Sequence, residues 1–290
     1  MHVHTIASGE CKTPFVSLFS RESYTAPLEA YSLLRQRGMD LVTLTDHDSI
    51  EGAEQLRHRA DFFLSEELTC TMPSGTEAHV AVYDIAERQH LELLRRRNDL
   101  PALLAYLDEQ KIFFSINHIF SCLTGARHAE DFQWFQDHFP ALEARNGAML
   151  ARQNGNSEEL ARQWRKFAIG GSDAHAAASA GRTYTDVPGA RNKEEFLAGL
   201  RAGKARVGGD SGSYLKLTRD ILLVGAEMVR DNHWKAFLAP LALLVPGFTV
   251  FNYISECRFG QRWAAEVLEQ AETRAKARWK RPQAAAEELL

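Results

Sequence analysis

Short apolar runs alternate with amphipathic stretches over the first two-thirds of the chain. Each apolar run holds four to seven residues and is bounded by turn-forming residues, as buried parallel strands are. The sequence therefore predicts six strands, at residues 40–45, 62–68, 78–84, 112–117, 141–145 and 167–170.

The stretches between these runs have helical periodicity. Pro27 suits a first helical turn, and Gly38 and Gly203 suit helix ends. Strands that alternate with helices predict parallel βαβ units, and six in a row favour a barrel or a wound sheet. The predicted helices are residues 27–37, 50–59, 87–110, 131–139, 157–166 and 192–202.

This alternation stops near residue 214. Residues 214–235 have a helical pattern, 236–254 are almost wholly apolar, and 256–290 form a charged helix that we expect to be exposed and to fray from residue 266 onward. We therefore expect two parts, a catalytic unit at 1–213 and a helical C-terminal extension at 214–290. The apolar segment is long enough to span a membrane. Its prolines and Asn252 favour a buried or docked segment instead, with a membrane-surface contact or a partner interface left open.

Composition and charge exclude several classes of protein. Hydrophobic residues make up 45% and charged residues 25%, which are globular proportions. The net charge of −4 argues against a broad nucleic-acid surface, so we expect no stable nucleic-acid partner. The four cysteines form no CxxC pair, which argues against a disulfide framework and a cysteine zinc site. With no signal-peptide pattern at the start, we expect a cytoplasmic protein.

The chemistry-bearing residues gather at the ends of the predicted strands. In a barrel these ends converge on one face, where active sites form. His2 and His4 lie two residues apart, so in extended backbone both imidazoles point to the same side. Six of the eleven histidines occupy such positions: His2, His4, His47, His79, His118 and His175.

Carboxylates accompany these histidines. The sequence TDHD follows the first predicted strand, and we assign its His47 to the site and Asp48 or Ser49 to a helix cap. Of the adjacent Glu66 and Glu67, one points into a cationic site and the other to solvent. Asp173 and His175 share one face of GGSDAH.

Histidine and carboxylate ligands without cysteine suit Mn, Fe or Zn. A divalent metal lowers the pKa of bound water from about 15.7 to roughly 7 and so supplies hydroxide at neutral pH. The sequence therefore predicts a metal-dependent hydrolase.

The ordered motifs HVHT, TDHD, EEL, EAHV, INH and GSDAH resemble those of the PHP (polymerase and histidinol phosphatase) family over residues 1–210. The resemblance implies an α/β fold, a distorted (β/α)7 TIM-like barrel, with two or three divalent metal ions and phosphoester hydrolysis. It implies that His2, His4, Glu67 and Asp173 hold one metal, that Glu67, His79 and His118 hold a second, and that His47 and His175 belong to a third position. The resemblance also implies that Glu67, and not Glu66, is the carboxylate that bridges two metals.

The sequence departs from the family pattern at two points. Gly9 stands where family members carry an Asp or His ligand of the third metal, so we expect Glu10 to substitute or the third site to be weak or empty. The family's first strand precedes the HxH pair, so we expect poor support for the barrel seam near residue 2. Stretches such as GRTYTDVPGA look like an uncharacterised bacterial subgroup of the family.

The expected reaction is hydrolysis of a phosphomonoester or phosphodiester of a small metabolite or nucleotide. Asp173, His47 and His175 are the catalytic candidates, and either histidine could protonate the leaving group. Arg182, which an ion pair would explain equally well, and Asn146 are the candidates for substrate binding. Two alternatives stay open. One is an amidohydrolase-like metal hydrolase, although no matching lysine ends a strand; the other is a non-catalytic metal-binding module that docks through 236–254.

Overall fold

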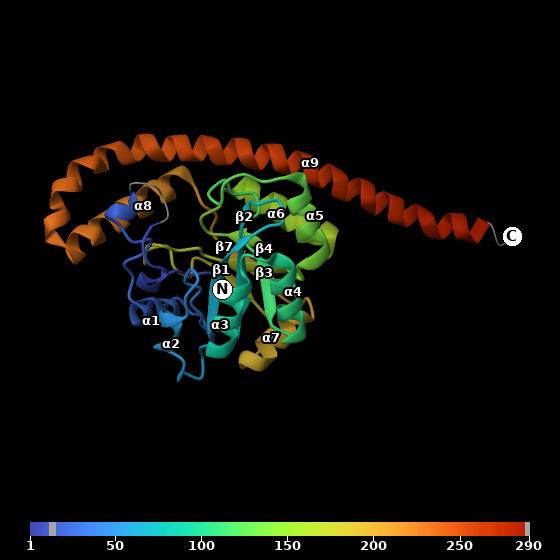
Figure 1. Ribbon diagram of the computed structural model, residues 1–290, viewed down its shortest axis with the longest axis horizontal. Coiled ribbons are helices and arrows are strands. Elements are labelled where there is room, and N and C mark those ends of the chain that lie inside the picture. Colours follow the sequence, from blue (N-terminus) through green and yellow to red (C-terminus); the bar gives the residue numbers. More distant parts are fainter. Residues whose placement is uncertain (12–15, 288–290) are drawn as a thin grey trace.

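A mixed five-stranded sheet forms the centre of the molecule (Figure 1). The computed structural model describes residues 1–11 and 16–287. The strands follow one another across the sheet in chain order, and helices pack around them, which confirms the α/β class. They are β1 (Ser65–Thr71), β2 (Glu77–Tyr83), β3 (Phe113–Ile116), β4 (Ala141–Asn146) and β5 (Phe167–Gly171).

Strand direction corrects the prediction of an all-parallel sheet. The pairs β1–β2 and β2–β3 are antiparallel, and only β3, β4 and β5 run parallel. Residues 72–76 alone join β1 to β2, whereas a parallel crossover needs about a dozen residues or more. Because β2 runs backwards, its early residue His79 lies beside Asn117, just past the end of β3. His79 therefore reaches the same rim as residues at the ends of the other strands.

Two irregular extended segments connect the outer strands β5 and β1. Val3 forms a parallel bridge with Ala174, just past β5, and the amide of Thr45 donates to the Val3 carbonyl. His47 in turn bridges Glu67 of β1. Hydrogen bonds thus support the backbone near residue 2 on both sides, against our expectation of a poor seam. Among the described residues, however, the regular strands form an open sheet and not a closed barrel.

The helices follow the predicted pattern with local changes. The predicted helix 87–110 is divided, because the Asp99 side chain accepts from Ala102 N and begins a new helix. The stretch 50–59 forms only a short helix, and the small antiparallel sheet of β6 and β7 was not predicted. The elements are α1 (Pro27–Gln36), α2 (Glu51–Glu54), α3 (Glu87–Arg96), α4 (Leu100–Glu109), α5 (Ala129–His138), α6 (Ala151–Trp164), α7 (Lys193–Arg201), β6 (Thr183–Asp186), β7 (Arg206–Gly209), and the short helices η1 (Ile6–Ser8) and η2 (Val16–Leu18).

The C-terminal extension consists of α8 (Tyr214–Asp231), η3 (His233–Leu244) and the long α9 (Val245–Glu287), which passes over the body of the molecule (Figure 1). The middle of α9 is docked: Trp263 is buried and its ring lies 5.2 Å from that of Phe132 in α5. The buried Glu256 carboxylate accepts hydrogen bonds from Ser121 and Gln153. This part of the predicted charged helix is therefore not an exposed appendage.

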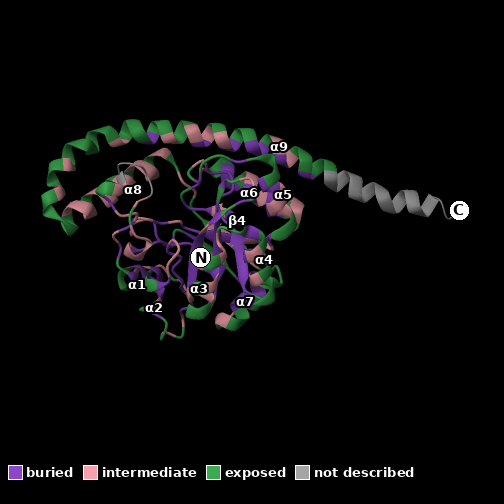
Figure 2. Cartoon of the chain, viewed as in Figure 1, coloured by how far each residue is buried: buried purple, intermediate pink, exposed green. Residues whose placement is uncertain are grey.

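The apolar segment 236–254 is largely exposed, which corrects the buried alternative of our interpretation and leaves the docked one as a prediction. Leu243 is 84% exposed and Phe251 70% exposed, and the exposed colour dominates this part of the extension in Figure 2. The helical stretch His233–Thr273 is long and apolar enough to cross a membrane by length and composition. The two prolines and the glycine do not prevent helix formation, because the chain passes from η3 into α9 at Val245.

Candidate metal centre

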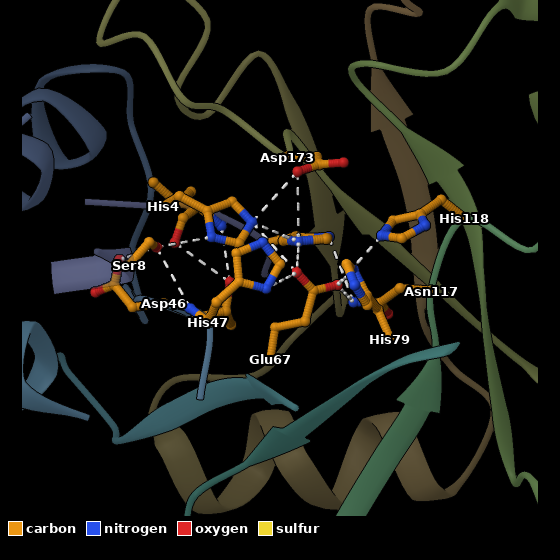
Figure 3. Close-up of polar contacts among 12 residues, drawn as sticks. His4, Ser8, Asp46, His47, Glu67, His79, Asn117, His118 and Asp173 are labelled. Carbon is orange, nitrogen blue, oxygen red and sulfur yellow. Dashed lines mark hydrogen bonds and ion pairs between the residues drawn. The ribbon is translucent and has the colours of Figure 1, made fainter. Parts of the chain in front are cut away.

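Histidine and acidic side chains from six separate segments meet at one rim of the sheet (Figure 3). They come from residues 2–4, from the segment that ends at His47, from β1, from β2, and from the turns that follow β3 and β5. Four groups of three have ligand atoms within 4.8 Å of one another: His2, Glu67 and His118; His2, His4 and Asp173; His47, Glu67 and His79; and His4, His47 and His175.

Glu67 lies at the middle of this cluster, and each of its oxygens faces a different set of imidazoles (Figure 3). Its Oε2 lies 3.1 Å from His2 Nε2 and 3.4 Å from His47 Nδ1. Its Oε1 lies 3.2 Å from His118 Nε2 and 3.6 Å from His79 Nδ1. A carboxylate in this position can bridge two cations.

Asp173 covers the other side of the HxH pair. Its Oδ1 lies 3.3 Å from His4 Nε2 and 3.5 Å from His2 Nε2, and these two nitrogens are 3.0 Å apart. Ligand atoms around a metal with bonds of about 2.0–2.2 Å are separated by roughly 3.0–3.5 Å. The donor spacing therefore fits a divalent metal.

Electrostatics in the cluster favour ionised acids. Burial opposes ionisation of Glu67, but His2, His79 and His47 outweigh it and hold the pKa of this carboxyl well below its usual range. Burial likewise opposes ionisation of Asp173, and His2 and His4 lower its pKa. Both acids are therefore present as carboxylates, the form that binds a metal.

The two N-terminal imidazoles shift in the opposite direction. Burial lowers the pKa of His4, but hydrogen bonds to Asp173 and Glu67 outweigh burial and raise it to about 9. The pKa of His2 is also raised, because Glu67, Asp173 and Glu143 together outweigh its burial. Without a metal these imidazoles hold protons, which a cation would displace.

Unusual backbone geometry brings the segments close together. Gly171 lies against the HxH segment, and a Cβ atom there would be 2.2 Å from the Cβ of His2. Both His118 and Asp173 have positive φ, at 28° and 47°. Such conformations cost energy in residues other than glycine and are frequent at functional sites.

Two polar residues that we did not select support the ligands. Glu143 Oε1 lies 2.8 Å from His2 Nδ1, and its Oε2 accepts from the amide of His118. Asn117 donates to Glu67 Oε1 over 2.8 Å. Metal-binding histidines commonly donate their second ring nitrogen to a carboxylate, which fixes the ring. The sequence signal for Glu143 was an acid inside the buried run ALEAR, where apolar residues are expected.

Glu66 and Asp48 do not take the positions that we predicted. Glu66 is fully buried rather than turned to solvent, and it lies 2.8 Å from His90 Nδ1. Asp48 has φ 52° and accepts from the amide of Thr69, whereas Ser49, the other residue predicted for the cap, accepts from the amide of Glu51 at the start of α2. Both acids lie outside the four ligand groups; for Glu66 the reason is that successive residues of a strand point to opposite faces.

The two predicted substrate-binding residues lie in different surroundings. Asn146 is buried and donates to Asp173 Oδ2 over 3.0 Å and to Glu143, so it orients the aspartate. Arg182 Nη1 lies 3.7 Å from Asp210. Arg182 also lines a pocket of about 410 Å³ together with Asp210, Ser211, Ser213, Leu215, Lys216 and Arg219.

Comparison with known proteins bears on the segment that carries Asp173 and His175. Residues 151–205 match the family model described as PHP-associated. Over these residues the chain is similar to PHP-associated proteins. This agrees with the ordered motifs of residues 1–210, from which the PHP resemblance was predicted. A search of curated proteins found no match.

Three solved structures resemble this chain at low sequence identity. PsfC from Pseudomonas syringae PB-5123 is 17% identical, with a TM-score of 0.48 over 69% of this chain and 87% of that one. A protein from Bifidobacterium adolescentis described as a metal-dependent phosphoesterase is 13% identical, with a TM-score of 0.41 over 70% and 94%. The lesion-specific endonuclease PfuEndoQ from Pyrococcus furiosus is 14% identical, with a TM-score of 0.45 over 65% and 56%.

Proposed function

We propose that this chain is a metal-dependent phosphoesterase that hydrolyses a phosphomonoester or phosphodiester of a small metabolite or nucleotide. One observation carries the proposal: Glu67 presents one oxygen to His2 and the other to His118, so two cation positions adjoin at a single carboxylate. Paired cations suit phosphate ester hydrolysis, because one can act on the attacking oxygen and the other on the leaving oxygen. The match of residues 151–205 to the PHP-associated family model supports a metal-dependent hydrolase at the coarse level.

The donor set divides between two positions. His2, His4, Asp173 and one oxygen of Glu67 would hold one divalent metal, and His79, His118 and the other oxygen of Glu67 would hold a second. Bound there, Mn, Fe or Zn would supply a Lewis acid and lower the pKa of water to roughly 7. We further interpret the sheet and its two connecting segments as a distorted seven-stranded barrel, whose rim carries these ligands.

Residues at the open side of the cluster are suited to binding the substrate and to donating a proton. His175 is 34% exposed at its side chain and is the most open histidine of the four ligand groups. If the third metal position is empty, His175 would protonate the leaving oxygen, as would His47. Arg182, Lys216 and Arg219 would hold an anionic part of the substrate in the adjacent pocket. That pocket adjoins the site because Lys216 Nζ donates to the carbonyl of Gly147, next to Asn146.

Metal-dependent turnover tests the proposal. Purified protein stripped of metal and reloaded with Mn, Fe or Zn is expected to hydrolyse p-nitrophenyl phosphate or its bis ester, and the stripped protein is not. Asp173→Asn should abolish turnover with its circular dichroism spectrum unchanged. Asp186→Asn, at an exposed position of β6, should retain it. Metal binding without turnover of either ester would contradict the proposal and favour a non-catalytic module, and turnover of amides alone would favour an amidohydrolase-like enzyme.

A further inference from the structure

A group of imidazoles close to Gly9 is a candidate for binding a third metal ion. His4, His47 and His175 make up one of the four ligand groups, with ring centroids 4.5 Å apart for His4 and His47 and 4.4 Å apart for His4 and His175. Three imidazoles need a further ligand to complete a tetrahedral site. The glycine at position 9 has no side chain to offer, and Glu10 is exposed and belongs to none of the described ligand groups.

The chain returns to this position after residue 20. Glu10 and Arg21 form an antiparallel bridge, and the amide of Cys11 donates to the Ser20 carbonyl. The amide of Glu22 donates to the carbonyl of Gly9 over 3.1 Å. Backbone pairing therefore holds Glu22 directly beside the glycine.

The Glu22 side chain points into the cluster. It is 11% exposed, and its Oε2 lies 3.1 Å from His47 Nε2 and 3.8 Å from His175 Nε2. These separations resemble those of Asp173 from His4 and His175 in the first position. The Glu22 carboxylate and the imidazoles of His47 and His175 make a donor set that suits Zn, Mn or Fe, and His4, a ligand of the first position, lies beside them.

We propose that Glu22 supplies the carboxylate ligand of a third divalent cation, with His4, His47 and His175 as its neighbours. The role of this cation in turnover rests on the proposed function. The binding of the cation to Glu22 does not depend on that function. Glu22 thus supplies the negatively charged ligand that Gly9 cannot supply.

Metal content tests this inference. Each protein is equilibrated with excess Zn or Mn, dialysed, and its metal-to-chain ratio is measured by elemental analysis. We expect Glu22→Gln to hold one equivalent less than the unsubstituted protein, and Glu22→His, which keeps a ligand, to regain it. Glu10→Gln is the matched control and should match the unsubstituted protein.

An unchanged metal ratio in Glu22→Gln would overturn the inference, as would an unsubstituted protein with only two equivalents; Glu22 would then be an ion-pair partner of His47. Anomalous scattering from crystals of the two proteins locates the lost equivalent. Failure of the proposed function is a different result, namely full metal content without turnover. The two failures are therefore distinguishable.

A different observation concerns residues 233–254, which we call the apolar arm. From Asn232 to Ser255 the sequence contains no Asp or Glu, and Lys235 is its only Lys or Arg. Trp234 is 77% exposed, and Phe237, Leu243 and Phe251 are also exposed. Contiguous exposed apolar surface of this kind marks an interaction site.

Internal packing fixes the apolar arm without covering it. Thr218 of α8 lies 2.8 Å from Thr249 of α9 through their hydroxyls, and the Tyr214 and Tyr253 rings meet edge to face. The arm folds at the end of the extension where η3 passes into α9, away from the sheet (Figure 1). Its outward side chains are therefore available to a partner.

We propose that the apolar arm docks on the surface of an anionic membrane. Aromatic side chains with a nearby lysine suit the interface between lipid headgroups and acyl chains, and the absence of acids avoids repulsion by anionic lipid. Within the arm η3 gives way to α9 at Val245, so neither helical piece of the arm alone reaches the roughly 20 residues of a crossing helix.

Sedimentation with vesicles of phosphatidylcholine and phosphatidylglycerol tests the docking. We expect the full chain to sediment with them, and the combined variant Trp234→Ser, Phe237→Ser, Phe251→Ser to bind at least about tenfold more weakly. The control Leu91→Ser, Leu123→Ser removes exposed apolar side chains outside the arm and should bind normally. A soluble dimer that the arm variant dissociates, absence of sedimentation, or bound protein that resists alkaline extraction as a spanning helix does would each overturn the proposal.

Discussion

Glu67→Gln is expected to lose both metals of the proposed dinuclear site and to lower phosphoesterase activity at least about 1000-fold. The neutral amide keeps the shape of the side chain, but it cannot bridge two cations with two charged oxygens. The loss would affect both positions at once, because Glu67 faces His2 on one side and His118 on the other. Elemental analysis and p-nitrophenyl phosphate turnover measure the two effects.

The neighbouring acid provides a matched control. Glu66→Gln changes the same residue type one position away, but Glu66 faces His90 and not the cluster. Burial raises the pKa of Glu66, although His90 opposes this, so the neutral amide is a modest change there. Glu66→Gln should keep its metal content and its turnover. Equal activity in the two variants would contradict the central position of Glu67.

Metal removal is expected to lower the melting temperature by about 10 °C, and by more at pH 9 than at pH 6.5. A ligand present at 1,000 times its dissociation constant stabilises the fold by about 4 kcal/mol, and each kcal/mol shifts the melting temperature of a chain of this size by about 2–4 °C. Differential scanning fluorimetry with and without EDTA measures the shift.

The pH dependence follows from the imidazoles of the metal-free protein. Hydrogen bonds to Asp173 and Glu67 outweigh burial and raise the pKa of His4 from 6.5 to about 9. A raised pKa stabilises the metal-free fold below pH 6.5, and this contribution disappears as the pH rises through about 9. Metal binding must displace these protons, so it strengthens over the same interval. The same shift at both pH values would contradict this linkage, and Glu67→Gln, as a control, should show a much smaller metal-induced shift.

Local patterns in the sequence were sufficient to predict the α/β class and most of its elements. Five of the six predicted strands overlap β1 to β5, because their apolar runs are short and bounded by turns. The run 40–45 forms no regular strand, although Val42 bridges Phe62. The sequence alone did not indicate the reversed direction of β2, since an apolar run shows where a strand lies and not in which direction it pairs.

The sequence by itself determined which residues can bind metal, because HxH, TDHD and GSDAH place imidazoles and acids at strand ends. Only the tertiary structure decided which acids face them. Strand alternation aims Glu67 inward and Glu66 at His90, and Glu143 reaches His2 from 141 residues away. Backbone pairing of Glu22 with Gly9 is likewise invisible in a linear pattern. Spacing along the chain reports only neighbours on one segment, whereas a metal centre is assembled from side chains that distant segments bring together.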